Sequence, residues 1–372
     1  MLIGVPKEVK THEYRVGLTP ASVREVVAHG HHVVVETGAG VGVGFSDDDY
    51  RTAGAQIAST GHAVFAAADM VVKVKEPQAQ EILNLRENQV LFTYLHLAPD
   101  PEQAKGLLKS GCTAIAYETV TDKLGGLPLL APMSAVAGRM SIQAGARCLE
   151  KESGGAGILL GGVAGVPPAK VVVLGGGVAG TNAAQTAAGL MADVTILDSS
   201  MPRLRELDLH FSGKVKTLFS TTAAVERAVL EADLVIGAVL IPGAAAPKLV
   251  TRDLLRRMKK GSVVVDIAID QGGCLETSRP TTHDNPTYIE EGVVHYCVAN
   301  MPGAVARTST FALNNATLPY VLALADKGWK KACGDDPYLR TGLNLHAGKV
   351  THAAVAEALK LPLQRAEDAL GL

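Results

Sequence analysis

One stretch of the sequence constrains the fold more than any other, because a run of β-branched residues leads directly into closely spaced glycines. Residues 170–174 read as a strand, and the chain continues with Gly175, Gly177 and Gly180 in the pattern G-x-G-x-x-G. In a dinucleotide site, Gly175 makes the tight turn and Gly177 lets the backbone approach the pyrophosphate. Gly180 then lets the following helix pack closely on the strand.

The residues after the glycines complete this pattern. We expect a helix from Val178 to about Met191, whose N-terminal N–H groups point at phosphates, and then a strand at 193–198. The strand ends on Asp198, about 20 residues on, where a carboxylate accepts hydrogen bonds from the ribose hydroxyls and repels a 2′-phosphate. In a chain with 39 glycines the glycine pattern alone is weak. Strand, helix and acid together favour an NAD site over a plain glycine loop, and NAD over NADP.

The length of the chain indicates two domains, since 372 residues exceed the roughly 250–300 that a single core organises. Residues 170–300 hold six expected strands, which match two mononucleotide-binding halves. The first 120 residues also alternate strands and helices, which predicts a second, mostly parallel sheet. The expected strands are 2–5, 32–36, 71–75, 90–95 and 113–117 in the first domain, and 170–174, 193–198, 215–219, 233–238, 262–267 and 293–298 in the second.

The expected fold is therefore α/β, with two doubly wound, Rossmann-like parallel-sheet domains joined by long helices. A helical stretch from Leu129 to about Glu150 suits a linker, and a helix from near Arg307 to Leu324 is interrupted by Pro319. The helical segments after it are too few to form a core alone, so we expect them to return to the first domain. The predicted boundaries are 1–128 with 307–372 for a discontinuous substrate domain, and 129–306 for the NAD-binding domain.

Composition narrows the possible partners and the location. A formal net charge of −2 argues against nucleic acid and against an anionic membrane surface. The longest uncharged run, 153–169, is broken by six glycines and two prolines, so we expect no membrane-spanning helix. The N-terminus lacks signal-peptide features, and five scattered cysteines fit reduced thiols of a cytoplasmic protein. The histidines at 29, 31, 32, 283 and 295 lack metal-ligand spacing, so no metal is expected.

Four charged or titratable residues follow expected strands, where ligands of open α/β sheets bind. Arg15 lies in the loop after the first strand, Lys75 and His96 end two others, and Asp270 follows the strand near Val265. Each alone has an ordinary alternative: a loop ion pair, a solvated charge, a core histidine or a turn carboxylate. Asp266, closer to the strand, can simply brace the turn. Beside an NAD site, however, the four predict hydride chemistry on a small acid in a common cleft.

With these residues in hand, the chain closely resembles the L-alanine dehydrogenase family, which includes the NAD-binding component of proton-translocating nicotinamide nucleotide transhydrogenases. The likeness runs from Ile3 to about Ala325. It is carried by the motifs at 3–8, 13–16, 73–77, 94–97, 133–138, 240–243, 266–273 and 299–305.

The resemblance implies reversible, NAD-dependent oxidative deamination of L-alanine to pyruvate and ammonium through an imine. Arg15 and Lys75 would hold the substrate, His96 would be the general acid/base, and Asp270 would orient or deprotonate water. Arg205 is an equally available alternative to one implied cofactor residue, Arg203. Besides Gly175, Gly177 and Gly180, the implied cofactor residues are Ser134, Val178, Ala179, Asp198, Arg203, Ser220, Val239, Leu240, Ile267, Asp270, Arg279, Val298, Asn300 and Met301.

Three alternatives to this function stay open. The first is a transhydrogenase component that passes hydride between nucleotides, although such relatives typically carry Glu at the position of Asp270. The second is a non-catalytic NAD-binding module, and the third is a dehydrogenase for another small 2-amino acid. The resemblance also implies a homo-oligomer, a homohexamer.

Overall fold

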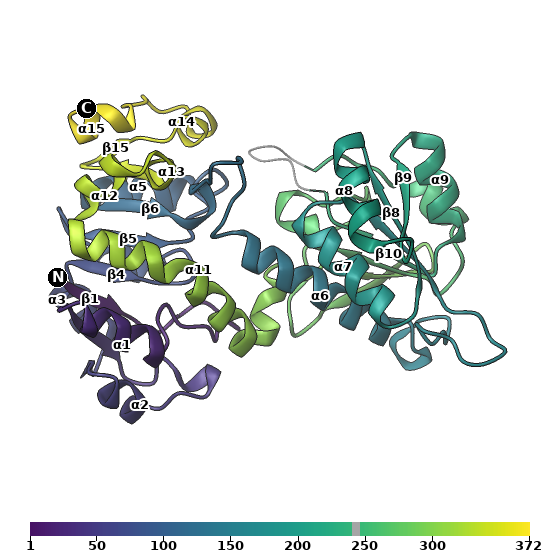
Figure 1. Cartoon of the computed structure of the whole chain (residues 1–372), viewed down its shortest axis with the longest axis horizontal. Helices are drawn as coiled ribbons and strands as arrows, with labels where there is room; N and C mark the ends of the chain where they lie inside the picture. Colours follow the sequence, from purple (N-terminus) through teal and green to yellow (C-terminus); the bar gives the residue numbers. More distant parts are fainter. Residues whose placement is uncertain (240–245) are drawn as a thin grey trace. The chain divides into compact units, whose positions relative to one another are not determined.

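The chain divides into two compact units, each built on one sheet (Figure 1). The computed structural model describes residues 1–239 and 246–372. Unit 1 comprises Met1–Met133 and Val305–Leu372, and unit 2 comprises Ser134–Ala304. Both sheets are mostly parallel and carry helices, so the expected α/β class with two Rossmann-like sheets is confirmed.

The sheet of unit 1 has eight strands in the order β15-β14-β6-β5-β4-β1-β2-β3. Neighbours among the first six strands in the chain are parallel, whereas β14 runs antiparallel to β6 and β15 antiparallel to β14. The segment after unit 2 therefore returns to the first sheet and extends it. The strands are β1 Leu2–Val5, β2 His32–Glu36, β3 Gln56–Ala58, β4 Met70–Val72, β5 Val90–Thr93, β6 Thr113–Ala116, β14 Leu343–His346 and β15 Lys349–Val350.

Two strands of unit 1 are shorter than the sequence predicted. β4 ends at Val72 and β5 at Thr93, so neither Lys75 nor His96 ends a strand. Both strands end early for the same physical reason. Just past each strand, a carboxylate side chain accepts hydrogen bonds from backbone N–H groups. Glu8 accepts the N–H of Val74, and Glu118 accepts that of His96. Lys75 and His96 thus lie in the loops that follow the carboxyl ends of β4 and β5.

Helices cover the sheet of unit 1, and their ends follow the expected capping chemistry. Thr19 caps α1 by accepting the N–H of Ser22, with Pro20 at the first helical position. α11 contains Pro319 and still continues as one helix, so the predicted interruption is wrong. Asn314 of α11 accepts hydrogen bonds from Thr19 and Ser22, which fixes α11 against α1. The helices are α1 Pro20–Ala28, α2 Asp47–Thr52, α3 Gly61–Ala67, α4 Ala79–Ile82, α5 Pro101–Ser110, α11 Ala306–Lys327, α12 Trp329–Asp335, α13 Pro337–Arg340, α14 Ala353–Leu359 and α15 Ala366–Leu370.

The sheet of unit 2 has seven strands in the order β12-β13-β11-β10-β7-β8-β9. Six are parallel and match the six predicted positions, and β12 adds an antiparallel edge that the sequence did not reveal. The strands are β7 Lys170–Leu174, β8 Asp193–Asp198, β9 Lys216–Phe219, β10 Leu234–Gly237, β11 Val263–Asp266, β12 Thr287–Glu290 and β13 Val293–Tyr296. The helices are α6 Ala131–Cys148, α7 Val178–Gly189, α8 Met201–Phe211, α9 Thr222–Glu231 and α10 Arg252–Arg257.

The core of unit 2 lies on both faces of this sheet. On the central strand β7, Val171 and Val173 pack into one buried cluster, and Val172 and Leu174 pack into the other. A parallel strand covered on both faces must be apolar throughout, which explains its uninterrupted hydrophobic run. Among the residues that the structure describes, no helix is long and apolar enough to cross a membrane.

Candidate active site

Each sheet has a topological switch point, where the strand order reverses and ligands of doubly wound folds bind. In unit 1 it lies between β1 and β4, and in unit 2 between β7 and β10. The residues that the sequence singled out lie in the loops after the carboxyl ends of these and neighbouring strands.

The glycine turn of unit 2 has the geometry that its spacing predicts. Gly175 has a φ of +100°, which glycine adopts readily and other residues rarely do. A Cβ on Gly180 would lie 1.8 Å from the carbonyl oxygen of Gly175, so only glycine lets α7 pack this closely. A Cβ on Gly177, the N-cap of α7, would meet nothing within 4 Å. The first turn of α7 is therefore open on the side where the backbone can receive a phosphate.

Asp198 ends β8 beside this turn. Its Oδ2 accepts the N–H of Gly176 at 2.7 Å, and its Oδ1 accepts the N–H of Ser200 at 2.8 Å. The half-buried carboxylate is thereby fixed next to the glycines.

Arg203 fastens α8 to the glycine turn. Its Nε donates to the carbonyl of Gly176 at 2.7 Å, its Nη2 donates to Thr181 Oγ1 at 2.9 Å, and its Nη1 pairs with Glu206 at 2.7 Å. Arg203 therefore contacts the glycine turn, and its preference over Arg205 as a cofactor residue stays a prediction.

The remaining implied cofactor residues occupy loops or helix ends of unit 2. Ser220 follows β9 and donates its N–H to the carbonyl of Asp198 at 3.0 Å. Val239 comes after Ala238, which is the first residue beyond β10. Asn300 has a φ of +66°, and the Arg279 guanidinium lies 4.0 Å from the ring centroid of Tyr288. Leu240 lies outside the described residues. Val178 and Ala179 begin α7, Ile267 begins a 3-10 turn after β11, Val298 and Met301 are buried after β13, and Ser134 is on α6.

The two carboxylates after β11 have different surroundings. Asp266 is fully buried and accepts hydrogen bonds from Cys274 N at 2.7 Å and from Ser278 Oγ at 2.6 Å. Burial raises the pKa of Asp266 more than these hydrogen bonds lower it. Asp270 is exposed in the 3-10 turn that follows. Asp266 therefore braces the turn, and Asp270 is the carboxylate that a ligand can reach.

In unit 1, Arg15 lies in the loop after β1 and is almost completely buried. Its Nε and Nη2 donate to the two oxygens of Glu13 at 2.7 and 2.6 Å, and its Nη1 lies 3.1 Å from Met133 Sδ. Burial acts to lower the pKa of Arg15, but the hydrogen bonds and charge of Glu13 outweigh burial and raise it. Glu13 thus holds one edge of the guanidinium, and Nη1 donates toward Met133 Sδ.

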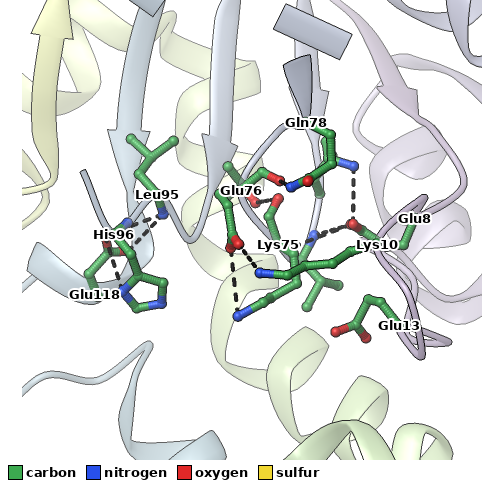
Figure 2. Close-up of polar contacts among 12 residues, drawn as sticks. Glu8, Lys10, Glu13, Lys75, Glu76, Gln78, Leu95, His96 and Glu118 are labelled. Atoms are coloured by element: carbon green, nitrogen blue, oxygen red, sulfur yellow. Dashed lines mark hydrogen bonds and ion pairs between the residues drawn. The ribbon is translucent and has the colours of Figure 1, made fainter. Parts of the chain in front are cut away.

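Lys75 follows β4 and shares Glu76 with Lys10, which comes from the loop after β1. Figure 2 shows both ammonium groups converging on the Glu76 carboxylate; the Lys75 Nζ lies 3.6 Å from Oε2, and Lys10 pairs with Oε1. Burial acts to raise the pKa of Glu76, but Lys75 and Lys10 outweigh it and hold the pKa below its ordinary value. Glu76 therefore stays ionised between the two lysine side chains.

Sequence reasoning missed a buried charge cluster beneath these residues. Lys73 is fully buried and pairs with Glu8 at 3.1 Å and with Glu81 at 2.7 Å. Burial alone would lower the pKa of Lys73, but the two carboxylates outweigh it and raise the pKa. Glu8 also accepts the N–H of Val74, so the cluster fixes the backbone that leads to Lys75.

His96 follows β5 and is partly exposed. Its ring lies parallel to that of Tyr94, with an interplanar angle of 3° and 5.8 Å between centroids. Its Nδ1 lies 3.9 Å from Glu118 Oε1 (Figure 2). Arg15, Lys75 and His96 thus follow the carboxyl ends of three adjacent parallel strands, β1, β4 and β5, as the sequence predicted for ligand residues. Asp270 lies at the equivalent edge of the other sheet, in unit 2.

Within residues 1–239 and 246–372, no three His, Cys, Asp or Glu side chains cluster to hold a metal ion. All five cysteines are buried and none forms a disulfide, and burial raises the pKa of the thiols, to about 11 for Cys112 and about 12 for Cys274.

Comparisons with known proteins agree over the whole chain. A family model described as "Alanine dehydrogenase/PNT, N-terminal domain" matches residues 4–137, and its C-terminal counterpart matches 141–353. An alanine dehydrogenase of Halomonas elongata is 62% identical over 371 residues, and one of Methanococcus maripaludis is 57% identical, each covering 100% of both chains. A solved structure of L-alanine dehydrogenase, 54% identical, covers 97% of this chain and 99% of its own with a TM-score of 0.94. A transhydrogenase from Sinorhizobium meliloti is 28% identical, covering 95% of this chain and 100% of its own with a TM-score of 0.81.

Proposed function

Because the chain belongs to the alanine dehydrogenase and transhydrogenase family, we propose that it is an L-alanine dehydrogenase. The reaction is L-alanine + NAD⁺ + H₂O → pyruvate + NH₄⁺ + NADH + H⁺. The observation that carries the proposal is the set of Arg15, Lys75 and His96, which follow adjacent parallel strands of unit 1. This set supplies two cations for a carboxylate and an imidazole for proton transfer, in a chain 62% identical to an alanine dehydrogenase.

The cofactor residues of unit 2 fit NAD. The open side of Gly177 and the N-terminus of α7 suit a pyrophosphate, and the fixed carboxylate of Asp198 suits an unphosphorylated ribose. Arg203 is bound to Gly176, Thr181 and Glu206, so its guanidinium is already committed to protein groups. When bound, NAD⁺ supplies the hydride acceptor.

In the substrate site, the roles follow from the charges. The compact ammonium of Lys75 attracts the carboxylate and polarises the 2-oxo group of pyruvate in the reverse direction. Arg15, whose guanidinium is oriented by Glu13, would bind the carboxylate as well. Both cations would thereby orient Cα for hydride loss, and the enzyme would gain rate from this positioning.

Proton transfer falls to His96 and Asp270. Loss of hydride from Cα produces an imine, and Asp270 orients or deprotonates the water that adds to its carbon. His96 gives a proton to the nitrogen that departs as ammonia, since imidazole exchanges protons near neutral pH. The exposure of both side chains leaves them accessible to a substrate.

The test is formation of NADH by the purified protein with L-alanine and with a panel of other small 2-amino acids, with NADP⁺ in parallel. His96→Ala should lower kcat by roughly 10²–10⁴-fold. The Kd for NAD should change far less, because none of the residues proposed to hold the cofactor is His96. Equal losses of turnover and NAD affinity would contradict the role of His96. Hydride exchange between nucleotides without alanine activity would instead support a transhydrogenase component. Binding of NAD with neither activity would support a non-catalytic module.

The assembly and location are also proposed from family resemblance. We expect a homohexamer that acts in the cytoplasm. Sedimentation equilibrium of the purified protein tests the first expectation, and cell fractionation tests the second.

A further inference from the structure

The carboxylate of Glu118 is joined to the loop that carries His96. Glu118 follows β6, the strand next to β5. Its Oε1 accepts the N–H of His96 at 2.7 Å, and both oxygens lie 3.2 Å from the N–H of Leu95 (Figure 2). One side chain thus binds two consecutive backbone donors just beyond the end of β5.

The backbone of His96 has a conformation that needs such support. Its φ is +47°, in the left-handed region, where residues other than glycine are uncommon, although asparagine, aspartate and histidine enter it more often than the rest. Conformations of this kind persist only when surrounding contacts enforce them, and they concentrate at functional sites. The bonds from His96 and Leu95 to Glu118 are such contacts.

The imidazole of His96 lies beside the same carboxylate and parallel to an aromatic ring. Its Nδ1 lies 3.9 Å from Glu118 Oε1, while its ring stacks parallel to Tyr94. Tyr94 is itself fixed, because its hydroxyl donates to the carbonyl of Leu129 and its ring meets Tyr117 edge-on. The Nδ1 side of the imidazole therefore faces a carboxylate, and Nε2 lies on the opposite side of the ring.

We propose that Glu118 is a positioning residue for His96: it enforces the left-handed backbone and favours the hydrogen on Nδ1, so that Nε2 is the nitrogen that exchanges a proton with the substrate. This inference rests on the proposed function, since it assumes that His96 acts on a bound substrate. A carboxylate beside one ring nitrogen of a catalytic imidazole favours the tautomer with the hydrogen on that nitrogen.

Two other titratable side chains interact electrostatically with Glu118 or with Tyr94. His352, which precedes α14, interacts electrostatically with Glu118, but burial lowers the pKa of His352 more than Glu118 raises it. His352 is therefore neutral near pH 7 and does not compensate the carboxylate. Arg15 lies close enough to Tyr94 for the two to interact electrostatically, but its Nε and Nη2 are bound to Glu13.

A purely structural cap is the competing explanation, and the chain offers a matched control for it. Glu36 at the end of β2 accepts the N–H of Lys7 at 2.8 Å, so it also ties a carboxylate to a loop backbone at the same edge of the sheet. Glu36→Gln removes a carboxylate from a comparable position without touching His96.

The experiment uses the full chain, labelled with ¹⁵N-histidine, and reads the tautomer of His96 from its ring nitrogen shifts, assigned with His96→Asn. In the unsubstituted protein we expect the hydrogen of neutral His96 on Nδ1. Glu118→Gln should move it toward Nε2 and lower kcat by on the order of 10²-fold, with KM for L-alanine and Kd for NAD unchanged. Glu36→Gln should change none of these quantities.

Two outcomes would overturn the proposal. One is a hydrogen on Nε2 in the unsubstituted protein, a measurement that does not depend on any variant folding. The other is Glu118→Gln with an unaltered tautomer and unaltered kcat. Absence of alanine-dependent NADH formation in the unsubstituted protein would instead contradict the proposed function. The tautomer measurement would still report whether Glu118 orients His96.

Discussion

The two units share a strand order, yet the edges where they are expected to bind ligands use opposite chemistry. Both sheets place six parallel strands in the doubly wound order, β3-β2-β1-β4-β5-β6 in unit 1 and β9-β8-β7-β10-β11-β13 in unit 2. At this edge, unit 1 carries paired charged side chains such as Lys73 with Glu8 and Arg15 with Glu13. Unit 2 presents glycines and backbone N–H groups at its turn, with Asp198 beside them.

The difference teaches why one half of the site is visible in the sequence and the other is not. A site made of backbone N–H groups needs glycines at a fixed, short spacing. The spacing of Gly175, Gly177 and Gly180 therefore indicates such a site directly. A side-chain site needs only that its partners meet in space, and Lys73 and Glu8 are 65 residues apart in the chain. Topology brings such pairs together, and no local pattern reveals them.

The comparison predicts that the edge of unit 1 is most sensitive to loss of a charge. Lys73→Met should cost about 3–5 kcal/mol of unfolding free energy, because it leaves Glu8 and Glu81 buried without a compensating cation. Trp329 is the only tryptophan and lies in unit 1, so denaturant unfolding followed by its fluorescence reports on this unit. Lys105→Met, which removes an exposed ion pair with Glu102, should cost less than about 1 kcal/mol. Equal effects of the two substitutions would break the comparison.

In unit 2, by contrast, one added methyl group should be more damaging than loss of a charge. Gly180→Ala places a Cβ 1.8 Å from the Gly175 carbonyl oxygen and should cost about 1–3 kcal/mol through backbone displacement. The loss should show in the far-ultraviolet circular dichroism transition, while the Trp329 transition keeps its midpoint. A shift of the Trp329 midpoint of the same size would mean that the two units do not unfold independently.

A second glycine separates folding from binding at the same turn. Gly177 has a φ of −66° and a ψ of −167°, which alanine also adopts, and its Cβ would meet no protein atom within 4 Å. Gly177→Ala should therefore leave stability unchanged and raise the Kd for NAD about tenfold, or roughly 1.4 kcal/mol, because the methyl fills the approach to the pyrophosphate. Calorimetric titration with NAD measures it. Unchanged affinity would remove Gly177 from the cofactor site.

The smallest expected effect concerns pH. His295 of unit 2 is fully buried between Thr277 Oγ1 at 2.9 Å and the carbonyl of Val293 at 3.0 Å, and burial lowers its pKa. The pKa of His295 in the folded protein lies below its unfolded value near 6.5. The stabilisation that neutral His295 gives to the folded protein is therefore complete above about pH 6.5, and it is lost as the pH falls toward the folded pKa. Each pKa unit between the two states is worth about 1.4 kcal/mol. Circular dichroism melts between pH 7 and pH 5 should show this loss, and His295→Asn should flatten it.

The sequence predicted the fold class and all six parallel strands of unit 2, because apolar runs and turn residues mark them locally. It missed β3, β12, β14 and β15, which are two to four residues long and carry little periodicity of their own. These strands exist because a neighbouring edge is available to pair with, and tertiary contacts of that kind leave no local signal.

The residues of the candidate site also include some that the sequence reveals and others that it does not. Arg15, Lys75 and His96 could be selected because each follows an expected strand. Glu118 could not be selected, although it also follows one, because its relevance depends on the loop conformation of His96. The exact ends of β4 and β5 could not be predicted either, since Glu8 and Glu118 end them from distant positions.

The pairing of β14 with β6 has a consequence for how the chain is made. Unit 2 is continuous, whereas unit 1 completes its sheet only after Ser134–Ala304 has been inserted between its two parts. A ribosome thus delivers every residue of unit 2 before it delivers β14. We expect unit 2 to become resistant to protease on the nascent chain first, while the edge of β6 stays open until β14 has been made.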